Sequence, residues 1–295
     1  MVSIGKLLYV LIVRPVASLP LPFLFFISDI LSLALFYSVG YRKQLVKTQL
    51  EQAFPEKSAK EIQQIARKFY RHFSDILVES LKLLAISEQE IVERCRITNE
   101  NILHQYYEKD RSVMILMGHY GNWEFITALA PQMKHQPIAL YAPLANPTFD
   151  LLIRQSRVRF GLQLIPKAAA RTGISEAQKI KHAIIFLTDQ CPTSKQTVYW
   201  TSFLHQPTAV LIGAEVYARR YNYVVLMGKV KKIKRGYYEL DFELITEHPK
   251  DLAVGMITEK HTKILEQQIK VAPEFWLWTH RRWKRKRQDY VKNIN

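Results

Sequence analysis

Apolar residues recur with two different spacings along most of this 295-residue chain. Short apolar runs bounded by polar residues or glycine are typical of buried strands, whereas apolar positions three and four apart are typical of helices. The first pattern predicts strands at residues 113–117, 138–141, 163–165, 183–187, 223–230 and 237–244. The second predicts helices at residues 123–130, 147–160, 174–181, 209–221 and 250–271. This alternation indicates an α/β fold with a mixed, mainly parallel sheet flanked by helices.

The last two predicted strands are separated by a short turn that contains Arg235 and Gly236. A connection this short joins antiparallel strands as a hairpin. We therefore expect this pair to be an antiparallel addition to the sheet.

The region before residue 113 is predicted to be largely helical. A first helix covers residues 44–54 and ends before a proline. Ser58 and Glu61 form a capping box, and apolar residues at helical spacing continue to about residue 84. Ser87 and Glu90 repeat the capping signal ahead of a shorter helix.

Residues 7–41 are overwhelmingly apolar, and prolines at positions 15, 20 and 22 interrupt the run. The densest part, residues 21–39, is about long enough to cross a bilayer at ~1.5 Å per residue. Asp29 lies in its middle, where a charge costs roughly 3 kcal/mol in hydrocarbon. Two interpretations stay open: one spanning or deeply inserted anchor, or a pair of helices lying in the interface and hinged at the prolines.

This composition divides the chain into a hydrophobic membrane anchor, residues 1–41, and a second domain, residues 42–295. Arg42, Lys43 and Lys47 follow the apolar segment directly. If the segment spans the bilayer, the positive-inside rule places the second domain in the cytoplasm.

The charge balance is strongly basic, with 42 Lys and Arg against 26 Asp and Glu and a net charge of +16. Such a surface attracts anionic lipid, nucleic acid or an acidic protein. Residues 275–287 interleave aromatic and basic side chains, which suits a membrane interface. Alternatively, their tryptophans close the core and the basic residues form a solvated tail. The two cysteines, Cys95 and Cys191, indicate no disulfide framework and favour a reducing compartment.

The candidate chemistry lies in the turn after the first predicted strand, residues 118–124, which carries His119 and Glu124. The carboxyl end of a buried strand is where α/β sheets present functional groups. Glu124 could hydrogen-bond one imidazole nitrogen and leave the other as a general base. An acceptor hydroxyl would then be the nucleophile. Further ligands are missing at any convincing spacing, so we expect no metal site.

This turn resembles the His-x4-Asp/Glu signature of glycerolipid-type acyltransferases. Its form at residues 117–124 is most similar to the late acyltransferases of lipid A biosynthesis, the lauroyl and myristoyl transferase family. The resemblance extends over most of the chain, because further matches follow in order after the apolar N-terminus, at residues 141–147, 154–157, 160–161, 187–190, 203–208, 213–215 and 276–284. It implies a glycerolipid acyltransferase-like fold and makes residues 42–295 the catalytic domain.

The resemblance implies an O-acyltransferase on the cytoplasmic face of an inner membrane. It would move a fatty acyl chain from an acyl carrier protein or coenzyme A thioester to a hydroxyl of a lipid A precursor, an anionic lipid. The thioester is the co-substrate, and no cofactor is expected. His119 would be the base, and Glu124 its partner.

The resemblance also implies a substrate-binding set. Arg157, or its neighbours Arg154 and Arg159, would stabilise the oxyanion or bind anionic substrate. Asp189 and Gln190 would hold polar headgroup atoms, or cap the next turn. Glu215 is expected at the acceptor site because it lies within an apolar helix, and Asn122 binds substrate or only shapes the turn.

Two segments depart from the family pattern and leave the acceptor open. Residues 188–200 lack a Gly/Ser-rich loop and a second Asp, and residues 174–182 lack the usual glycine before the strand. The alternative acceptor is another amphiphile, such as a lysophospholipid, aminolipid or glycolipid. An alternative of a different class is a non-catalytic, basic membrane-surface or nucleic-acid-binding protein. We expect no nucleic acid partner, because no nucleic-acid-binding fold is recognisable and the apolar N-terminus would be unexplained.

Overall fold

The computed structural model describes residues 9–193 and 196–291. Residues 1–8 of the expected anchor lie outside the described residues. So do residues 194–195, within the segment that departs from the family pattern, and residues 292–295.

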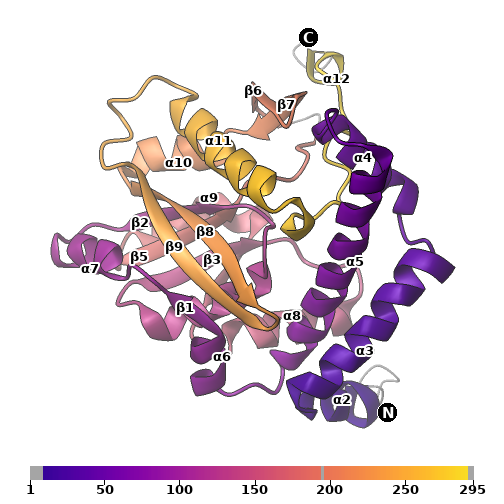
Figure 1. Ribbon diagram of the computed structural model, residues 1–295. Coiled ribbons are helices and arrows are strands. Elements are labelled where there is room, and N and C mark those ends of the chain that lie inside the picture. Colours follow the sequence, from indigo (N-terminus) through magenta and orange to yellow (C-terminus); the bar gives the residue numbers. More distant parts are fainter. Residues whose placement is uncertain (1–8, 194–195, 292–295) are drawn as a thin grey trace.

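A seven-stranded sheet forms the centre of the molecule, with the strand order β1-β9-β8-β2-β5-β3-β4 (Figure 1). Its β8–β9 hairpin is antiparallel, whereas its other strand pairs are parallel, which confirms the mixed, mainly parallel sheet. The strands are β1 Cys95–Ile97, β2 Val113–Met117, β3 Gln136–Tyr141, β4 Gln163–Pro166, β5 His182–Leu187, β8 Val224–Lys234 and β9 Tyr237–Thr246.

Helices cover both faces of this sheet. Val113, Ile115 and Met117 pack into one apolar core, whereas Met114 and Leu116 pack into another on the opposite face. A strand buried on both faces reads as a continuous apolar run, as the sequence of β2 does. The helices are α4 Lys43–Ala53, α5 Ala59–Lys82, α6 Glu88–Arg94, α7 Asn101–Glu108, η3 Trp123–Gln132, α8 Pro147–Val158, η4 Lys167–Ala169, α9 Ala170–Ala177, α10 Gly213–Tyr221, α11 Met256–Val271, η5 Pro273–Phe275 and α12 Gln288–Val291.

Most predicted elements are present, and the capping signals are confirmed. Ser58 and Glu61 form a complete capping box on α5, and Ser87 caps α6. The sequence patterns missed β1, α7 and a separate two-stranded sheet made of β6 Val198–Phe203 and β7 Gln206–Leu211.

Three predicted helix starts were wrong. The helix expected at residues 174–181 is α9, which begins at Ala170 and ends at Ala177. The helix expected from residue 209 begins at Gly213, because the preceding residues pair in β7. The helix expected from residue 250 begins at Met256, because Gly255 has a φ of 94° and Arg219 binds the carbonyls of the loop before it.

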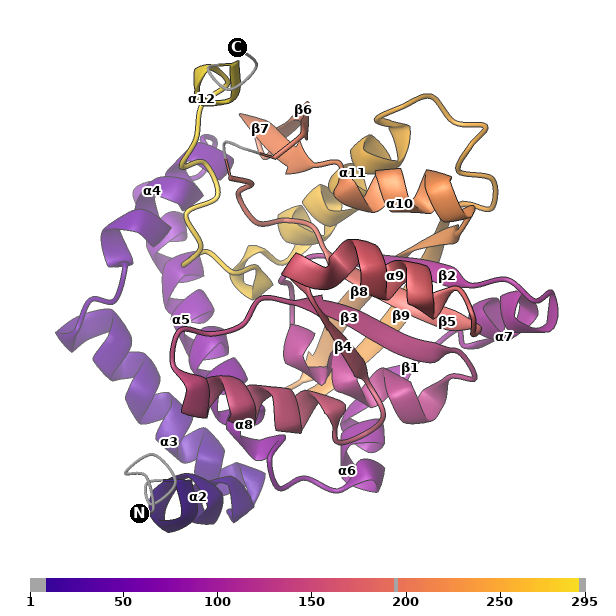
Figure 2. The same ribbon diagram turned by 180° about the vertical axis from the view of Figure 1, so that it is seen from behind.

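The apolar N-terminal region forms η1 Tyr9–Val13, α2 Arg14–Ser18, α3 Leu21–Leu33 and η2 Ala34–Ser38. In the described part of the chain, Leu21–Ser38 is the one helical stretch long and apolar enough to cross a membrane. Both views show α3 running beside α5 (Figures 1 and 2). Its inner side packs Leu21 and Leu24 against Val78, whereas Phe23, Phe26, Ile30 and Leu33 are exposed.

The C-terminal segment closes the core. Trp276 and Trp278 are buried, and the backbone of Leu277 donates to the carbonyl of His119. The prediction that these tryptophans close the core is therefore confirmed, and the alternative that these two side chains lie at a membrane interface is wrong. Arg281, Lys284 and Lys286 remain exposed.

Candidate active site

His119 and Asp189 meet at the carboxyl edge of the sheet. Strands β2 and β5 are parallel neighbours, and their register pairs Met117 with Leu187. Each polar residue follows its paired strand residue by two positions, so the two side chains emerge side by side. The pattern of the strands therefore contains the signal for this pair, although the sequence interpretation did not use it.

The hydrogen bonds fix the imidazole orientation. His119 Nδ1 lies 2.6 Å from Asp189 Oδ1, and the His119 backbone N–H donates to Asp189 Oδ2 at 2.9 Å. Because a carboxylate only accepts, Nδ1 carries the proton and Nε2 is left with a free lone pair. Nε2 accepts from the exposed Gln190 amide at 3.2 Å. The basic nitrogen therefore faces the accessible side of the site.

Asp189 is held as a carboxylate despite its burial. Burial raises the pKa of this carboxyl, but the nearby His119 and its hydrogen bonds outweigh that effect, so the pKa is well below its usual range. Trp276 Nε1 adds a hydrogen bond to Oδ2 at 2.7 Å. A buried anion beside Nδ1 stabilises the imidazolium that forms when Nε2 takes a proton.

Glu124 makes a different contact from the one expected. Its carboxylate pairs with Arg157, at 2.7 Å to the Nη2 atom and 3.0 Å to Nε, and also accepts from Trp123. The expected hydrogen bond between the imidazole and Glu124 is therefore wrong, because the Nδ1 atom of His119 already donates to Asp189. Burial lowers the pKa of Arg157, but the adjacent Glu124 outweighs it and the net pKa is raised.

The structure separates the three candidate arginines of α8 and its end. Arg157 reaches Glu124, whereas Arg154 lies over the Tyr141 ring and Arg159 donates to the Leu83 carbonyl. Arg157 is thus the one that the described contacts bring to the turn.

Asn122 and Glu215 are both buried and serve as caps. Asn122 Oδ1 accepts from the backbone N–H groups of Glu124 and Phe125 at the start of η3. Glu215 accepts from the backbone of Gly255 and from Thr258 at the start of α11. Asn122 therefore shapes the turn, and an acceptor-site role for Glu215 stays a prediction.

The turn itself requires glycine. Gly121 has a φ of 61°, and a Cβ there would lie 2.6 Å from Val230 Cγ1. Both the backbone conformation and the close approach of β8 exclude a side chain. The turn is also fixed from the other side, where the Gly121 N–H donates to the Phe275 carbonyl at 3.0 Å.

A small cavity of about 50 Å³ lies beside the Glu124–Arg157 pair. These two charged residues lie at one part of its wall, and most of the remaining lining is apolar. The apolar lining includes Ile126, Leu140, Leu162, Leu164, Ile185 and Leu187. The site thus combines an oriented histidine, a cation and a small apolar cavity.

Comparison with known proteins finds related sequences along most of the chain. Residues 2–285 match the family described as bacterial lipid A biosynthesis acyltransferase. The chain is 25% identical over 271 residues to the lipid A biosynthesis palmitoleoyltransferase of Escherichia coli (strain K12), which covers 90% of this chain and 86% of that protein. It is 22% identical over 245 residues to the lipid A biosynthesis lauroyltransferase of the same organism, which covers 82% and 79%. The chain belongs to the bacterial lipid A biosynthesis acyltransferase family.

Proposed function

We propose that this acyltransferase moves a fatty acyl chain from an acyl carrier protein or coenzyme A thioester to a hydroxyl of a lipid A precursor, with His119 as the general base. One observation carries the proposed mechanism. The Nδ1 atom of His119 is fixed by the buried Asp189 at 2.6 Å, while Nε2 faces the accessible side.

In the proposed reaction, His119 Nε2 takes the proton of the acceptor hydroxyl as its oxygen attacks the thioester carbonyl. The tetrahedral intermediate collapses, the C–S bond breaks, and the thiol leaves with the proton from the imidazolium. The products are the ester and the free thiol. Arg157, held by Glu124, supplies a positive charge to the oxyanion or to an anionic substrate group.

We assign the apolar cavity beside Arg157 to one end of the acyl chain, because a space of about 50 Å³ does not hold a whole fatty acyl chain. Its lining matches a hydrocarbon chain, and its charged wall adjoins the catalytic turn. The names of the relatives, palmitoleoyltransferase and lauroyltransferase, support a fatty acyl donor.

The proposed location is the cytoplasmic face of the inner membrane, with α3 in the plane of the interface. Exposed charges lie beside α3: Arg71 is 64% exposed and pairs with Asp29, and Lys231 and Lys234 lie near the hairpin tip. A spanning α3 would take these neighbours into hydrocarbon, at roughly 3 kcal/mol for each charge. The exposed apolar side of α3 would instead rest in the headgroup region.

The experiment is acyl transfer with purified enzyme, using acyl carrier protein and coenzyme A thioesters in separate reactions. A lipid A precursor and a lysophospholipid are offered as acceptors, and product masses are measured. We expect the lipid A precursor to gain one acyl chain and the thioester to release one thiol. Acylation of the lysophospholipid alone would contradict the proposed acceptor.

A further inference from the structure

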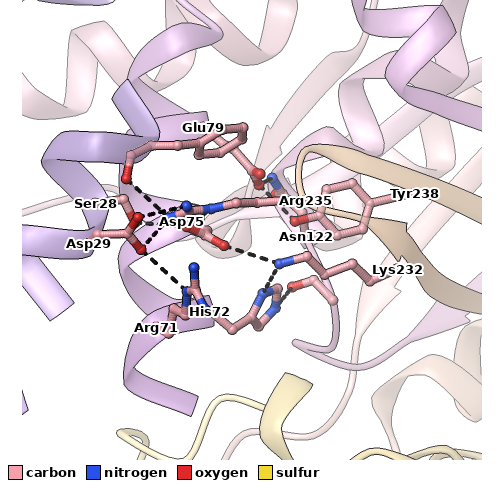
Figure 3. Close-up of polar contacts among 12 residues, drawn as sticks. Ser28, Asp29, Arg71, His72, Asp75, Glu79, Asn122, Lys232, Arg235 and Tyr238 are labelled. Atoms are coloured by element: carbon pink, nitrogen blue, oxygen red, sulfur yellow. Dashed lines mark hydrogen bonds and ion pairs between the residues drawn. The ribbon is translucent and has the colours of Figure 1, made fainter. Parts of the chain in front are cut away.

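A polar cluster that is buried except at its outer edge lies behind the catalytic turn (Figure 3). Helix α5 supplies its central residues, the β8–β9 hairpin supplies cations and a phenol, and α3 supplies its outer edge. We call it the α5 cluster; its labelled members are Ser28, Asp29, Arg71, His72, Asp75, Glu79, Asn122, Lys232, Arg235 and Tyr238. None of these contacts involves His119, so the mechanism above leaves the cluster unexplained.

Glu79 bonds to the catalytic turn through Asn122. The carboxylate is fully buried, and its Oε2 atom accepts from Asn122 Nδ2 at 2.6 Å and from the Tyr238 hydroxyl at 2.8 Å. Oε1 has no hydrogen-bond partner in the described part of the chain. Since Asn122 Oδ1 caps the backbone of Glu124, Glu79 fixes the amide group that in turn fixes the start of η3.

His72 supports the same turn one residue earlier. Its Nε2 lies 3.2 Å from the Gly121 carbonyl, and its Nδ1 lies 3.2 Å from Lys232 Nζ. Because the ammonium only donates, Nδ1 accepts and Nε2 carries the proton that it donates to Gly121. Burial, with Lys232 nearby, holds the pKa of His72 well below its usual range, so this ring stays neutral.

The cluster continues from the turn to the apolar helix α3. Asp75 pairs with Lys232 at 3.1 Å and with Arg235 at 2.7 Å, and it accepts from the Ser28 hydroxyl. Arg235 also binds both oxygens of Asp29 at 2.9 Å. One continuous network therefore joins the exposed apolar helix to the turn that carries His119.

We propose that Glu79 is a positioning residue, which holds the catalytic turn through Asn122 so that Glu124 and Arg157 are presented beside His119. The proposal rests on the proposed role of that turn in acyl transfer. A buried acid with an unpartnered oxygen is costly as a stabilising device, because apolar residues would fill the same space at lower cost. Its geometry instead matches a fixed acceptor for one particular amide, and small displacements of a catalytic group lower rates strongly.

The test compares three variants of the full-length enzyme. Glu79→Ala removes the acceptor, Glu79→Gln keeps one carbonyl oxygen for Asn122, and Tyr238→Phe removes only the second donor while keeping the ring against Phe125. We expect Glu79→Ala to lower kcat roughly 10- to 100-fold with little change in KM for the thioester. Glu79→Gln and Tyr238→Phe should keep most of the wild-type kcat. Rates are expressed per folded enzyme, from thermal unfolding of each sample.

Two results would overturn the proposal. One is a wild-type kcat in folded Glu79→Ala enzyme, and the other is an equal loss of kcat in Tyr238→Phe, which would indicate general loosening of the cluster. If Glu79→Ala does not fold, Glu79→Gln is compared with Tyr238→Phe. The proposal requires only an acceptor oxygen at position 79, which glutamine keeps, so a loss of kcat in Glu79→Gln would contradict the proposal. His119→Ala is assayed alongside. An active His119→Ala enzyme would refute the proposed mechanism, whereas an inactive one beside an active Glu79→Ala would refute only the positioning role.

Discussion

The partner of the candidate base comes from a different strand, 70 residues away in the sequence. The spacing within one turn suggested Glu124 as the partner of His119, but the Glu124 carboxylate pairs with Arg157 instead. The division leaves Asp189 to orient the imidazole and Glu124 to hold the cation. Two carboxylates near one histidine therefore have separate tasks, set by which partner each one reaches.

Replacing Asp189 tests this division. In Asp189→Asn the amide could donate to Nδ1 and favour the tautomer with its proton on Nε2, which removes the free lone pair from the reactive position. We expect kcat to fall roughly 10²- to 10⁴-fold with the fold retained, by analogy with other oriented histidine bases. Gln190→Ala is the matched control, because its amide touches the same ring from the exposed side, and it should lose far less. Equal, small effects of both substitutions would contradict an orienting role for Asp189.

The burial of Glu79 also leads to a prediction about the pH dependence of stability. Burial, partly offset by Lys232 and reinforced by Asp75, raises its pKa to about 7 from 4.5, while Tyr238 and Asn122 donate to it. The native state therefore retains a proton that the unfolded state releases, so this group costs stability as the pH rises from 4.5 to 7.

Glu79→Gln removes this titration. The wild-type protein should lose stability relative to the variant across that window, by roughly 3 kcal/mol at about 1.4 kcal/mol per pH unit. Urea unfolding of both proteins at pH 4.5, 5.5, 6.5 and 7.5 measures the difference. A difference that stays constant with pH would contradict the raised pKa.

At the residue scale, the sequence indicated candidates only where the signal was local. His119, Glu124 and Arg157 lie in matching motifs, and Asn122 lies in the turn itself. Asp189 was identified as a candidate, but its bond to His119 depends on which strands are neighbours, and the sequence interpretation did not order the strands. Glu79 was missed altogether, because it is one of several polar residues on a long amphipathic helix and its partners come from distant segments.

At the scale of elements, capping and periodicity located most helices, and apolar runs located most strands of the sheet. The missed β1 has three residues, too few to show the alternation of apolar and polar residues that marks a strand. The β6–β7 pair lies outside the main sheet. The end of β7 was assigned to the helix predicted from residue 209, and β6 was assigned to no element. Predicted element boundaries were wrong where tertiary contacts set the start of a helix, as Gly255 and Arg219 do before α11.

The in-plane position of α3 can be tested by depth measurement. Single cysteines replace Phe23, Phe26, Ile30 or Leu33 in a chain whose two native cysteines are substituted, and each is labelled with a fluorophore in liposomes. An in-plane helix places all four labels at a similar shallow depth, whereas a spanning helix places them at a progression of depths. Leu24→Cys is the control, because Leu24 faces α5 and is fully buried. A graded series of depths would contradict the in-plane position.

The whole molecule carries a net charge of +16, and its apolar helix and basic groups lie beside one another. This combination favours anionic interfaces and acidic partners over neutral ones. Basic charge alone left nucleic acid open as a partner, whereas the proposed anionic lipid acceptor and membrane surface would account for the same charge.

The contribution of the basic surface to membrane association can be measured as binding to vesicles. Binding to anionic liposomes should weaken as salt rises from about 0.05 to 0.5 M, because screening lengths fall below the spacing of surface charges. Residual binding at high salt should come from α3 and should fall in Phe26→Asp. Salt-insensitive binding of equal strength to neutral liposomes would contradict the electrostatic contribution.

The most direct test of His119 as the base is acyl transfer by His119→Ala, with thiol release and the mass of the acylated lipid measured in the same reaction. His248→Ala, at an exposed position, is the matched control. We expect a loss of roughly 10²-fold or more in His119→Ala and a wild-type rate in the control. Near-wild-type transfer by folded His119→Ala would contradict the assignment of His119 as the base.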